Sequence, residues 1–190
     1  LNKVKEKYTK DKACISMAAG IMIDKITEIL GSDAKIIRIM PNTPAQIGEA
    51  MTSASRNKNV TEKDFEVVMK ILNSVGIARE VDESLIHCVI GISGSSPAYT
   101  YMYIAALIEA ALKNGMNRET ATTFAAQSVI GAAKMVLLTG TNPEILRDNV
   151  CSPGGTTIEG VEKLKELKFS ETITEAFQAV VDKSIKMSEK

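Results

Sequence analysis

Short apolar runs alternate with segments of helical spacing over the first 81 residues. The runs at 14–17, 35–40, 50–55 and 77–81 predict β-strands, because each is brief and is bounded by glycine, proline or polar residues. Helices are predicted between the strands from apolar residues three and four positions apart: Met22, Ile26, Ile29 and Leu30, and, after a cap at Thr61, Phe65, Val68, Met69 and Leu72. Strands that alternate with helices are typical of an α/β layer with a mainly parallel sheet.

The pattern changes after about residue 82, and the rest of the chain is predicted to be helical. Ser93–Pro97 is interpreted as a breaker cluster before a helix at 97–113 that is apolar nearly all round. A helix at 118–138, capped by Asn117, is rich in the small residues that let another backbone approach closely. Further helices are predicted at 143–150, 157–168 and 171–188. We therefore expect two domains, residues 1–82 and 83–190, with dimerisation through the apolar surface of the C-terminal helices.

Composition and charge exclude several classes of partner. Lys+Arg and Asp+Glu balance at 23 each, so neither a nucleic acid nor a charged membrane surface is predicted as a partner. No apolar run is judged long enough to span a bilayer. Cys14, Cys88 and Cys151 form no C-x-x-C pattern, and His87 is the only histidine. We expect a cytoplasmic, reducing compartment and no metal site.

The stretch Ser152-Pro153-Gly154-Gly155-Thr156-Thr157 is the strongest candidate for a binding turn. Pro153 fixes one backbone angle, and the paired glycines remove side chains that would keep a ligand away from the main chain. Thr156 is predicted to be the N-cap of a helix, with Glu159 completing a capping box. The N–H groups and positive dipole end of such a helix suit a small carboxylate. Taken alone, the hexapeptide favours an ordinary helix-entry turn over a binding turn.

Three motifs in order give the chain a family resemblance. They are Arg38–Pro44 (RIMPNTP), Ser93–Tyr99 (SGSSPAY) and Ser152–Thr157 (SPGGTT). From about Cys14 to its end, the chain resembles the pyrroline-5-carboxylate reductase family. The resemblance implies part of a Rossmann-type sheet followed by an all-helical dimerisation domain. It also implies an oxidoreductase of proline biosynthesis, at least a homodimer, that reduces 1-pyrroline-5-carboxylate to L-proline with NADPH or NADH.

The resemblance assigns roles to two groups of residues. The main-chain N–H groups of Gly154, Gly155, Thr156 and Thr157 would bind the carboxylate of the cyclic imine within the substrate turn Ser152–Thr157. The Thr157 hydroxyl would orient the ring nitrogen as a hydrogen-bond donor. The predicted cofactor-binding residues are Ala18, Ala19 and Gly20, and Met40, Pro41, Asn42 and Thr43. These residues follow predicted strands, where ligands of open α/β sheets bind.

The chain departs from the family pattern in two features. Ser96 stands where the family usually carries glycine, and no G-x-G-x-x-G occurs in these 190 residues. Residues 1–81 therefore resemble only the second half of a Rossmann domain. We expect this chain by itself to bind NAD(P)H poorly and not to turn over; micromolar binding in a nucleotide titration would contradict that expectation.

Two other functions stay open at this point, and several side chains are set aside. The chain could be a related two-domain dehydrogenase of another imine or a hydroxy acid, or a non-catalytic dimerisation module. His87 lies among apolar residues and is interpreted as a packed side chain. Cys151 adjoins the turn but lacks an activating base. Gly91–Ser95 has serine where a nucleophile elbow needs its second glycine, and no histidine follows, which argues against a serine hydrolase.

Overall fold

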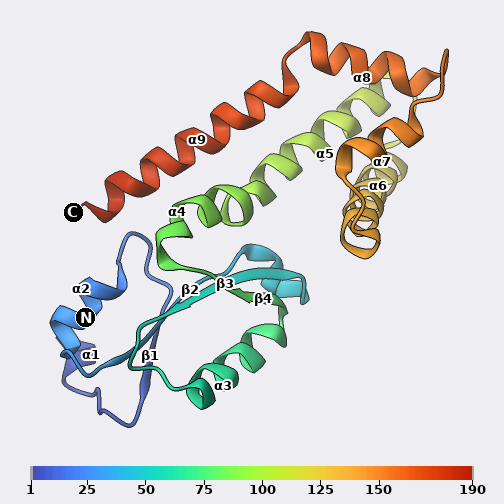
Figure 1. The fold of residues 1–190 in the computed structure, drawn as a ribbon. Coiled ribbons are helices and arrows are strands. Elements are labelled where there is room, and N and C mark those ends of the chain that lie inside the picture. Colours follow the sequence, from blue (N-terminus) through green and yellow to red (C-terminus); the bar gives the residue numbers. More distant parts are fainter. Residues whose placement is uncertain (1, 190) are drawn as a thin grey trace. The chain divides into compact units, whose positions relative to one another are not determined.

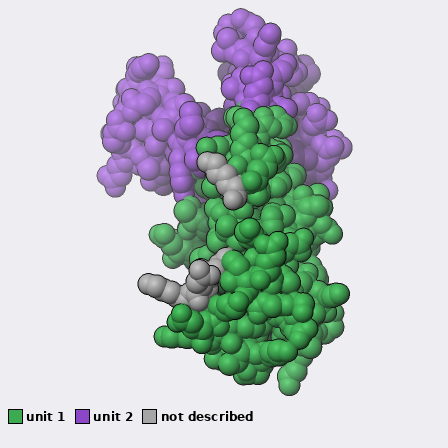
Figure 2. Space-filling model, turned by 90° about the vertical axis from the view of Figure 1, so that its left-hand side faces the viewer, with its two compact units in different colours: residues 1–97, 176–190 green, residues 98–175 purple. Residues whose placement is uncertain are grey.

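The computed structural model describes residues 2–189 and divides into two compact units. Unit 1 contains residues 1–97 and 176–190, and unit 2 contains residues 98–175, coloured green and purple in Figure 2. The chain passes between the units within two helices, α5 (Ser96–Lys113) and α9 (Phe169–Ser188). These units are defined by compactness, and the domain boundary expected after residue 82 stays a prediction.

Unit 1 is built on a four-stranded sheet in the order β1-β2-β3-β4 (Figure 1). The strands are β1 (Ala13–Ser16), β2 (Lys35–Met40), β3 (Ala50–Arg56) and β4 (Gly76–Glu80). The pairs β1–β2 and β3–β4 are parallel, but β2 and β3 are antiparallel, so the sheet is mixed. The physical reason is the link between β2 and β3, a single 3-10 helix (Thr43–Ile47). Such a link is too short for the crossover that parallel strands need.

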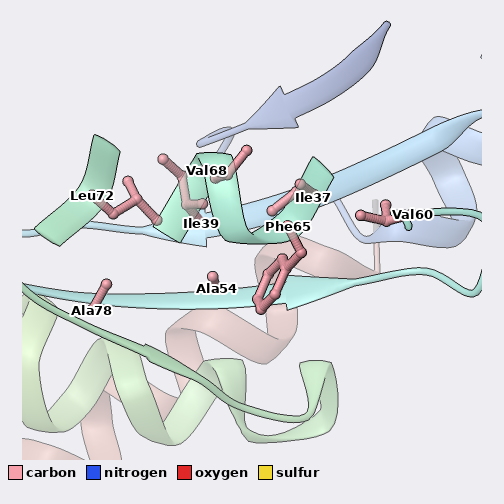
Figure 3. Packing of buried hydrophobic residues seen from close by; sticks show 8 residues of the cluster. All are labelled: Ile37, Ile39, Ala54, Val60, Phe65, Val68, Leu72 and Ala78. Carbon is pink, nitrogen blue, oxygen red and sulfur yellow. The ribbon is translucent and has the colours of Figure 1, made fainter. Parts of the chain in front are cut away.

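A helix covers each face of this sheet. Side chains alternate along β2, so Ile37 and Ile39 face α3 (Glu62–Asn73) while Ile36 packs with α2 (Ile23–Leu30). Figure 3 shows the larger cluster, which consists of Ile37, Ile39, Ala54, Val60, Phe65, Val68, Leu72 and Ala78. The smaller cluster consists of Ile23, Ile26, Ala34 and Ile36. The short helix α1 (Asn2–Lys5) precedes β1.

Unit 1 continues after β4 with helical segments that run into α5. A 3-10 turn (Glu83–Leu85) leads to α4 (Ile86–Val89) and then to a π-helical turn, η3 (Ile90–Gly94). The predicted break at Ser93–Pro97 is wrong, because the backbone keeps winding: the Ser95 N–H donates to the Ile90 carbonyl at 2.9 Å. The Ser93 hydroxyl donates to the Val89 carbonyl at 3.0 Å and stays within the turn.

Unit 2 is helical throughout. It contains most of α5, then α6 (Arg118–Thr139), α7 (Pro143–Val150), α8 (Thr156–Glu166) and the start of α9. The predicted cap at Asn117 is confirmed, since its side chain accepts the Thr120 N–H at 2.9 Å. The buried cluster of this unit is small and consists of Ile108, Ala121 and Ala125.

Helix α6 leaves most of its apolar surface uncovered within the chain. By length and composition it could cross a membrane, so the expectation that no run is long enough was wrong. Its apolar stretch is interrupted by Ser, Thr and Gly, which hid it from a count of consecutive apolar residues. Only 11% of its most apolar window is buried. These properties are weak evidence for a membrane span, and they equally fit a helix that packs against another protein chain.

Candidate functional site

The structure brings both predicted cofactor segments to one edge of the sheet. Strands β1 and β2 are parallel, with Ser16 opposite Arg38, so the residues that follow them leave the sheet at the same edge. Ala18, Ala19 and Thr43 are solvent-exposed there, whereas Met40, Pro41 and Asn42 are half-buried. Gly20 has a φ of 73°, a left-handed conformation that favours glycine in this turn.

The side chain of Asn42 is occupied by bonds within unit 1. Its Oδ1 accepts the Met51 N–H at 3.0 Å, and its Nδ2 donates to the Ser93 carbonyl at 3.1 Å. The two bonds tie the segment after β2 to the start of β3 and to η3. Asn42 therefore fixes the course of the backbone, which leaves the main chain and Thr43 as the groups of this segment that a ligand can reach.

A buried ion pair near this edge escaped the sequence analysis. Arg38, which is 3% exposed, donates through Nη1 to Glu83 Oε1 at 2.9 Å. The same oxygen accepts the Ile23 N–H at 2.9 Å, where a carboxylate suits the start of α2. An arginine inside an apolar strand was the only signal in the sequence. It did not identify the partner, because Glu83 lies 45 residues away. The pair anchors the start of α2 shortly after the Ala18–Gly20 turn.

In unit 2, two different constraints require the paired glycines. Gly154 has a φ of 70°, and a Cβ there would meet nothing within 4 Å, so conformation alone selects this glycine. At Gly155 the constraint is space, because a Cβ would lie 3.0 Å from the Ser152 carbonyl oxygen. The Gly155 N–H donates to that same oxygen at 2.9 Å and closes the turn.

Helix α8 begins one residue earlier than predicted. Its N-cap is Gly155, and Thr156 is its first residue, so the predicted cap at Thr156 and the capping box with Glu159 are wrong. The reason is that the Ser152–Gly155 turn delivers Gly155 in the extended conformation that a cap needs, with φ −82° and ψ 167°. Glycine has no side chain to accept the first helical N–H groups, so those of Thr156 and Thr157 are left for a ligand.

The surroundings of this turn are solvated. Ser152, Pro153, Gly154, Thr156 and Thr157 are all exposed in the chain. On the preceding helix α7, Arg147 binds the neighbouring Asp148, Nε to Oδ1, at 2.8 Å. This hydrogen bond raises the pKa of Arg147 above its ordinary value, so the guanidinium stays charged and is paired with a carboxylate of the same helix.

Other candidate groups have structural partners. His87 Nδ1 lies 2.8 Å from Ser184 Oγ, which agrees with its interpretation as a packed histidine. Cys14, Cys88 and Cys151 are free thiols. Within residues 2–189, no group of three or more His, Cys, Asp or Glu side chains is arranged to hold a metal ion.

Fold and site together define the class: part of a Rossmann-type α/β domain joined to a helical dimerisation domain. Residues 83–187 match the family model described as pyrroline-5-carboxylate reductase dimerisation. The pyrroline-5-carboxylate reductase of Escherichia coli is 47% identical over 188 residues, 99% of this chain and 70% of the relative. That of Arabidopsis thaliana is 41% identical over the whole chain and 68% of its own length.

Solved structures give the same result. The Plasmodium falciparum pyrroline carboxylate reductase with NADP bound is similar with a TM-score of 0.92 and 38% identity, covering 98% of this chain and 75% of the other. The Coxiella burnetii pyrroline-5-carboxylate reductase has a TM-score of 0.91 and 33% identity, covering 100% and 71%. The chain belongs to the pyrroline-5-carboxylate reductase family.

Proposed function

We propose that this protein reduces 1-pyrroline-5-carboxylate to L-proline by hydride transfer from NADPH or NADH, as an enzyme of proline biosynthesis. Family membership supports the reaction, and the Plasmodium relative with NADP bound supports the cofactor. The observation that carries the proposal is the exposed start of α8. There the cap at Gly155 leaves main-chain N–H groups open to a carboxylate.

The substrate turn has two tasks in this reaction. The N–H groups of Thr156 and Thr157 bind the carboxylate of the cyclic imine, whereas that of Gly155 is already used to close the turn. The Thr157 hydroxyl donates a hydrogen bond that orients the ring nitrogen. A threonine has no strong acidity, so Thr157 positions the imine and passes on a proton that comes from water. The imine carbon gains a hydride, and the nitrogen becomes the secondary amine of proline.

The edge of the sheet fits the nicotinamide end of a dinucleotide. Ala18–Gly20 and Met40–Thr43 leave parallel strands side by side, with Ala18, Ala19 and Thr43 exposed. The bound dinucleotide supplies the hydride, and these segments hold it in place. Asn42 serves this site by fixing its own segment, through its bonds to Met51 and Ser93. The choice between NADPH and NADH is left open by these residues.

The enzyme acts as a homodimer formed by its C-terminal helices. The matched family model is a dimerisation domain. Large exposed apolar side chains on α5 and α6 support this proposal: Tyr101, Met102, Phe124, Leu137 and Leu138. In this arrangement α6 packs on a second copy of the chain and not in a bilayer. The free cysteines fit the proposed cytoplasmic location.

The test is an assay of imine reduction with the full-length gene product. We expect L-proline to form with stoichiometric oxidation of NADPH or NADH. Turnover of another imine or of a hydroxy acid, with no proline formed, would favour the related dehydrogenase. A stable dimer that neither binds nucleotide nor forms proline would favour the dimerisation module.

A further inference from the structure

The C-terminal half of α9, residues 176–188, belongs to unit 1 and lies against the segments that carry the predicted cofactor residues. Three contacts hold it there. They involve the turn after β1, the π-helical turn η3 and helix α4, which lie far from α9 in the sequence.

The first contact joins the end of α9 to the turn after β1. A Cβ built on Gly20 would lie 2.8 Å from the carbonyl oxygen of Met187 and 3.1 Å from its carbonyl carbon. The backbone of the turn Ala18–Gly20 thus rests directly on the main chain of α9. The two Met187 atoms nearest to this Cβ position are main-chain atoms. The backbone of α9 therefore makes this contact, and the end of the methionine side chain contributes little.

The second contact reaches the other cofactor segment through η3. A Cβ built on Gly91 would lie 2.6 Å from Cε2 of the Phe177 ring, so the ring packs on bare backbone. On the same turn, Gly94 lies against Met40, with a built Cβ 3.1 Å from the methionine Cε. The Ser93 carbonyl accepts from Asn42. Phe177 therefore supports η3, and η3 supports the segment Met40–Thr43.

The third contact fixes the position of the helix along α4. Ser184 is 7% exposed on the half-buried face of α9, and its Oγ lies 2.8 Å from His87 Nδ1. This part-buried hydrogen bond favours one rotation and one translation of α9 against α4. It thereby keeps Met187 opposite Gly20 and Phe177 opposite Gly91.

We propose that residues 176–188 of α9 form a positioning element for the nicotinamide end of the cofactor site. The helix acts on Ala18–Gly20 directly and on Met40–Thr43 through η3. The identity of the ligand rests on the proposed function, whereas the support of the two segments rests only on the contacts above. Phe177 and Ser184 are positioning residues, because they act through Gly91 and His87 and touch no reacting atom.

The experiment uses Gly91→Ala, alone and combined with Phe177→Leu, in the full-length gene product. The added methyl group collides with the Phe177 ring, and the shorter leucine makes room for it again. In the nucleotide-free protein, we expect Gly91→Ala to speed amide hydrogen exchange in residues 18–20 and 40–43. We expect its Kd for NADPH to rise about fivefold to tenfold, near 1 kcal/mol, and the double variant to return within about twofold of wild type.

Two further variants provide the controls. Lys183→Ala changes an exposed side chain of the same helical segment and should leave exchange and Kd at the wild-type values. Ser184→Ala removes the His87 bond without adding bulk and should raise the Kd for NADPH about threefold, the usual loss for one hydrogen bond. If Gly91→Ala fails to fold by circular dichroism, Ser184→Ala decides the question. The KM for the cyclic imine should stay unchanged in every folded variant.

The outcomes separate this inference from the proposed function. Unchanged exchange and unchanged Kd in the folded variants would overturn the positioning role. An equal rise in the KM for the imine would also overturn it, because a general loss of structure would then explain the effect. Faster exchange in the two segments of Gly91→Ala, together with a wild-type protein that binds no nicotinamide nucleotide, would support the positioning element and contradict the proposed cofactor.

Discussion

Unit 1 and unit 2 differ in how they bury their apolar side chains. In unit 1 a helix packs on each face of the sheet, and Ile26, Ile36 and Ile37 are fully buried within the chain. In unit 2 the large apolar side chains of α6 lie outside, with Leu137 and Leu138 exposed by 72% and 83%. One unit builds its core from its own elements, and the other leaves apolar surface uncovered, which the proposed dimer would bury.

This difference fits the two tasks that we propose for the chain. The self-contained sheet of unit 1 carries the segments proposed to hold the cofactor, and it keeps their geometry through contacts within the unit. Unit 2 carries the proposed substrate turn on helices that leave large apolar side chains exposed within the chain. Variants in the core of unit 1 should therefore act through the stability of the folded chain, whereas variants on the exposed face of α6 should act through association.

The largest effect is expected at the substrate turn. Thr157→Ala should lower kcat about 100-fold, in the range reported for loss of one preorganised donor. The residue is exposed, so the free energy of unfolding should change by less than about 0.5 kcal/mol. Steady-state assays and urea denaturation measure the two effects. Thr157→Ser keeps the hydroxyl and should recover most of the activity; wild-type turnover in Thr157→Ala would remove Thr157 from the mechanism.

The next effect concerns association through unit 2. Phe124 is 68% exposed on α6, and Phe124→Asp should weaken the dimer about 100-fold, the loss of roughly 3 kcal/mol typical of an interface anchor. Sedimentation equilibrium measures the change. The matched control is Val67→Asp, which alters a 53% exposed apolar residue on α3 of unit 1. Equal dissociation in both variants, or none in either, would refute the contrast between the units.

An effect of comparable size, on stability and not on association, is expected from the core of unit 1. Ile37→Ala should lower the free energy of unfolding by about 2–5 kcal/mol, because it leaves a cavity between β2 and α3. Ile71→Ala, at a 59% exposed position of α3, should cost less than about 0.5 kcal/mol. Urea denaturation at two protein concentrations separates this loss from any effect of dimer dissociation. Similar losses in both variants would show that α3 is covered by another surface.

The smallest effect is expected at Thr52, a β3 residue that is 1% exposed. Among the described residues its Oγ1 has no hydrogen-bond partner. Thr52→Val replaces the hydroxyl with a methyl group of similar volume, so the variant should be neutral or more stable by up to about 1 kcal/mol. A loss above that value in thermal unfolding would indicate that the hydroxyl has a partner, for example a buried water.

The features that the sequence predicted well depend on neighbouring residues. The caps at Thr61 and Asn117 are confirmed, because a cap is a bond between residues three positions apart. The prediction at Thr156 failed by one residue, because the closed turn at Ser152–Gly155 decides where α8 begins. Likewise, apolar patterning located β2 and β3 but did not reveal that they are antiparallel.

Contacts between distant residues could not be predicted in this way. Arg38 and Glu83 are 45 residues apart, and His87 and Ser184 are 97 apart. Nothing in either local pattern specifies the partner. The roles of Thr157 and of the cofactor segments came from family resemblance, and they stay predictions until variants are measured.

The central claim is that unit 1 holds the cofactor and unit 2 the imine. Steady-state kinetics of Asn42→Ala and Thr157→Ala, with the nucleotide and the imine varied in turn, test it most directly. Asn42→Ala should raise the KM for NADPH and leave that for the imine unchanged. Thr157→Ala should lower kcat with the KM for NADPH unchanged. Equal changes toward both substrates in both variants, or the reverse pattern, would contradict the account.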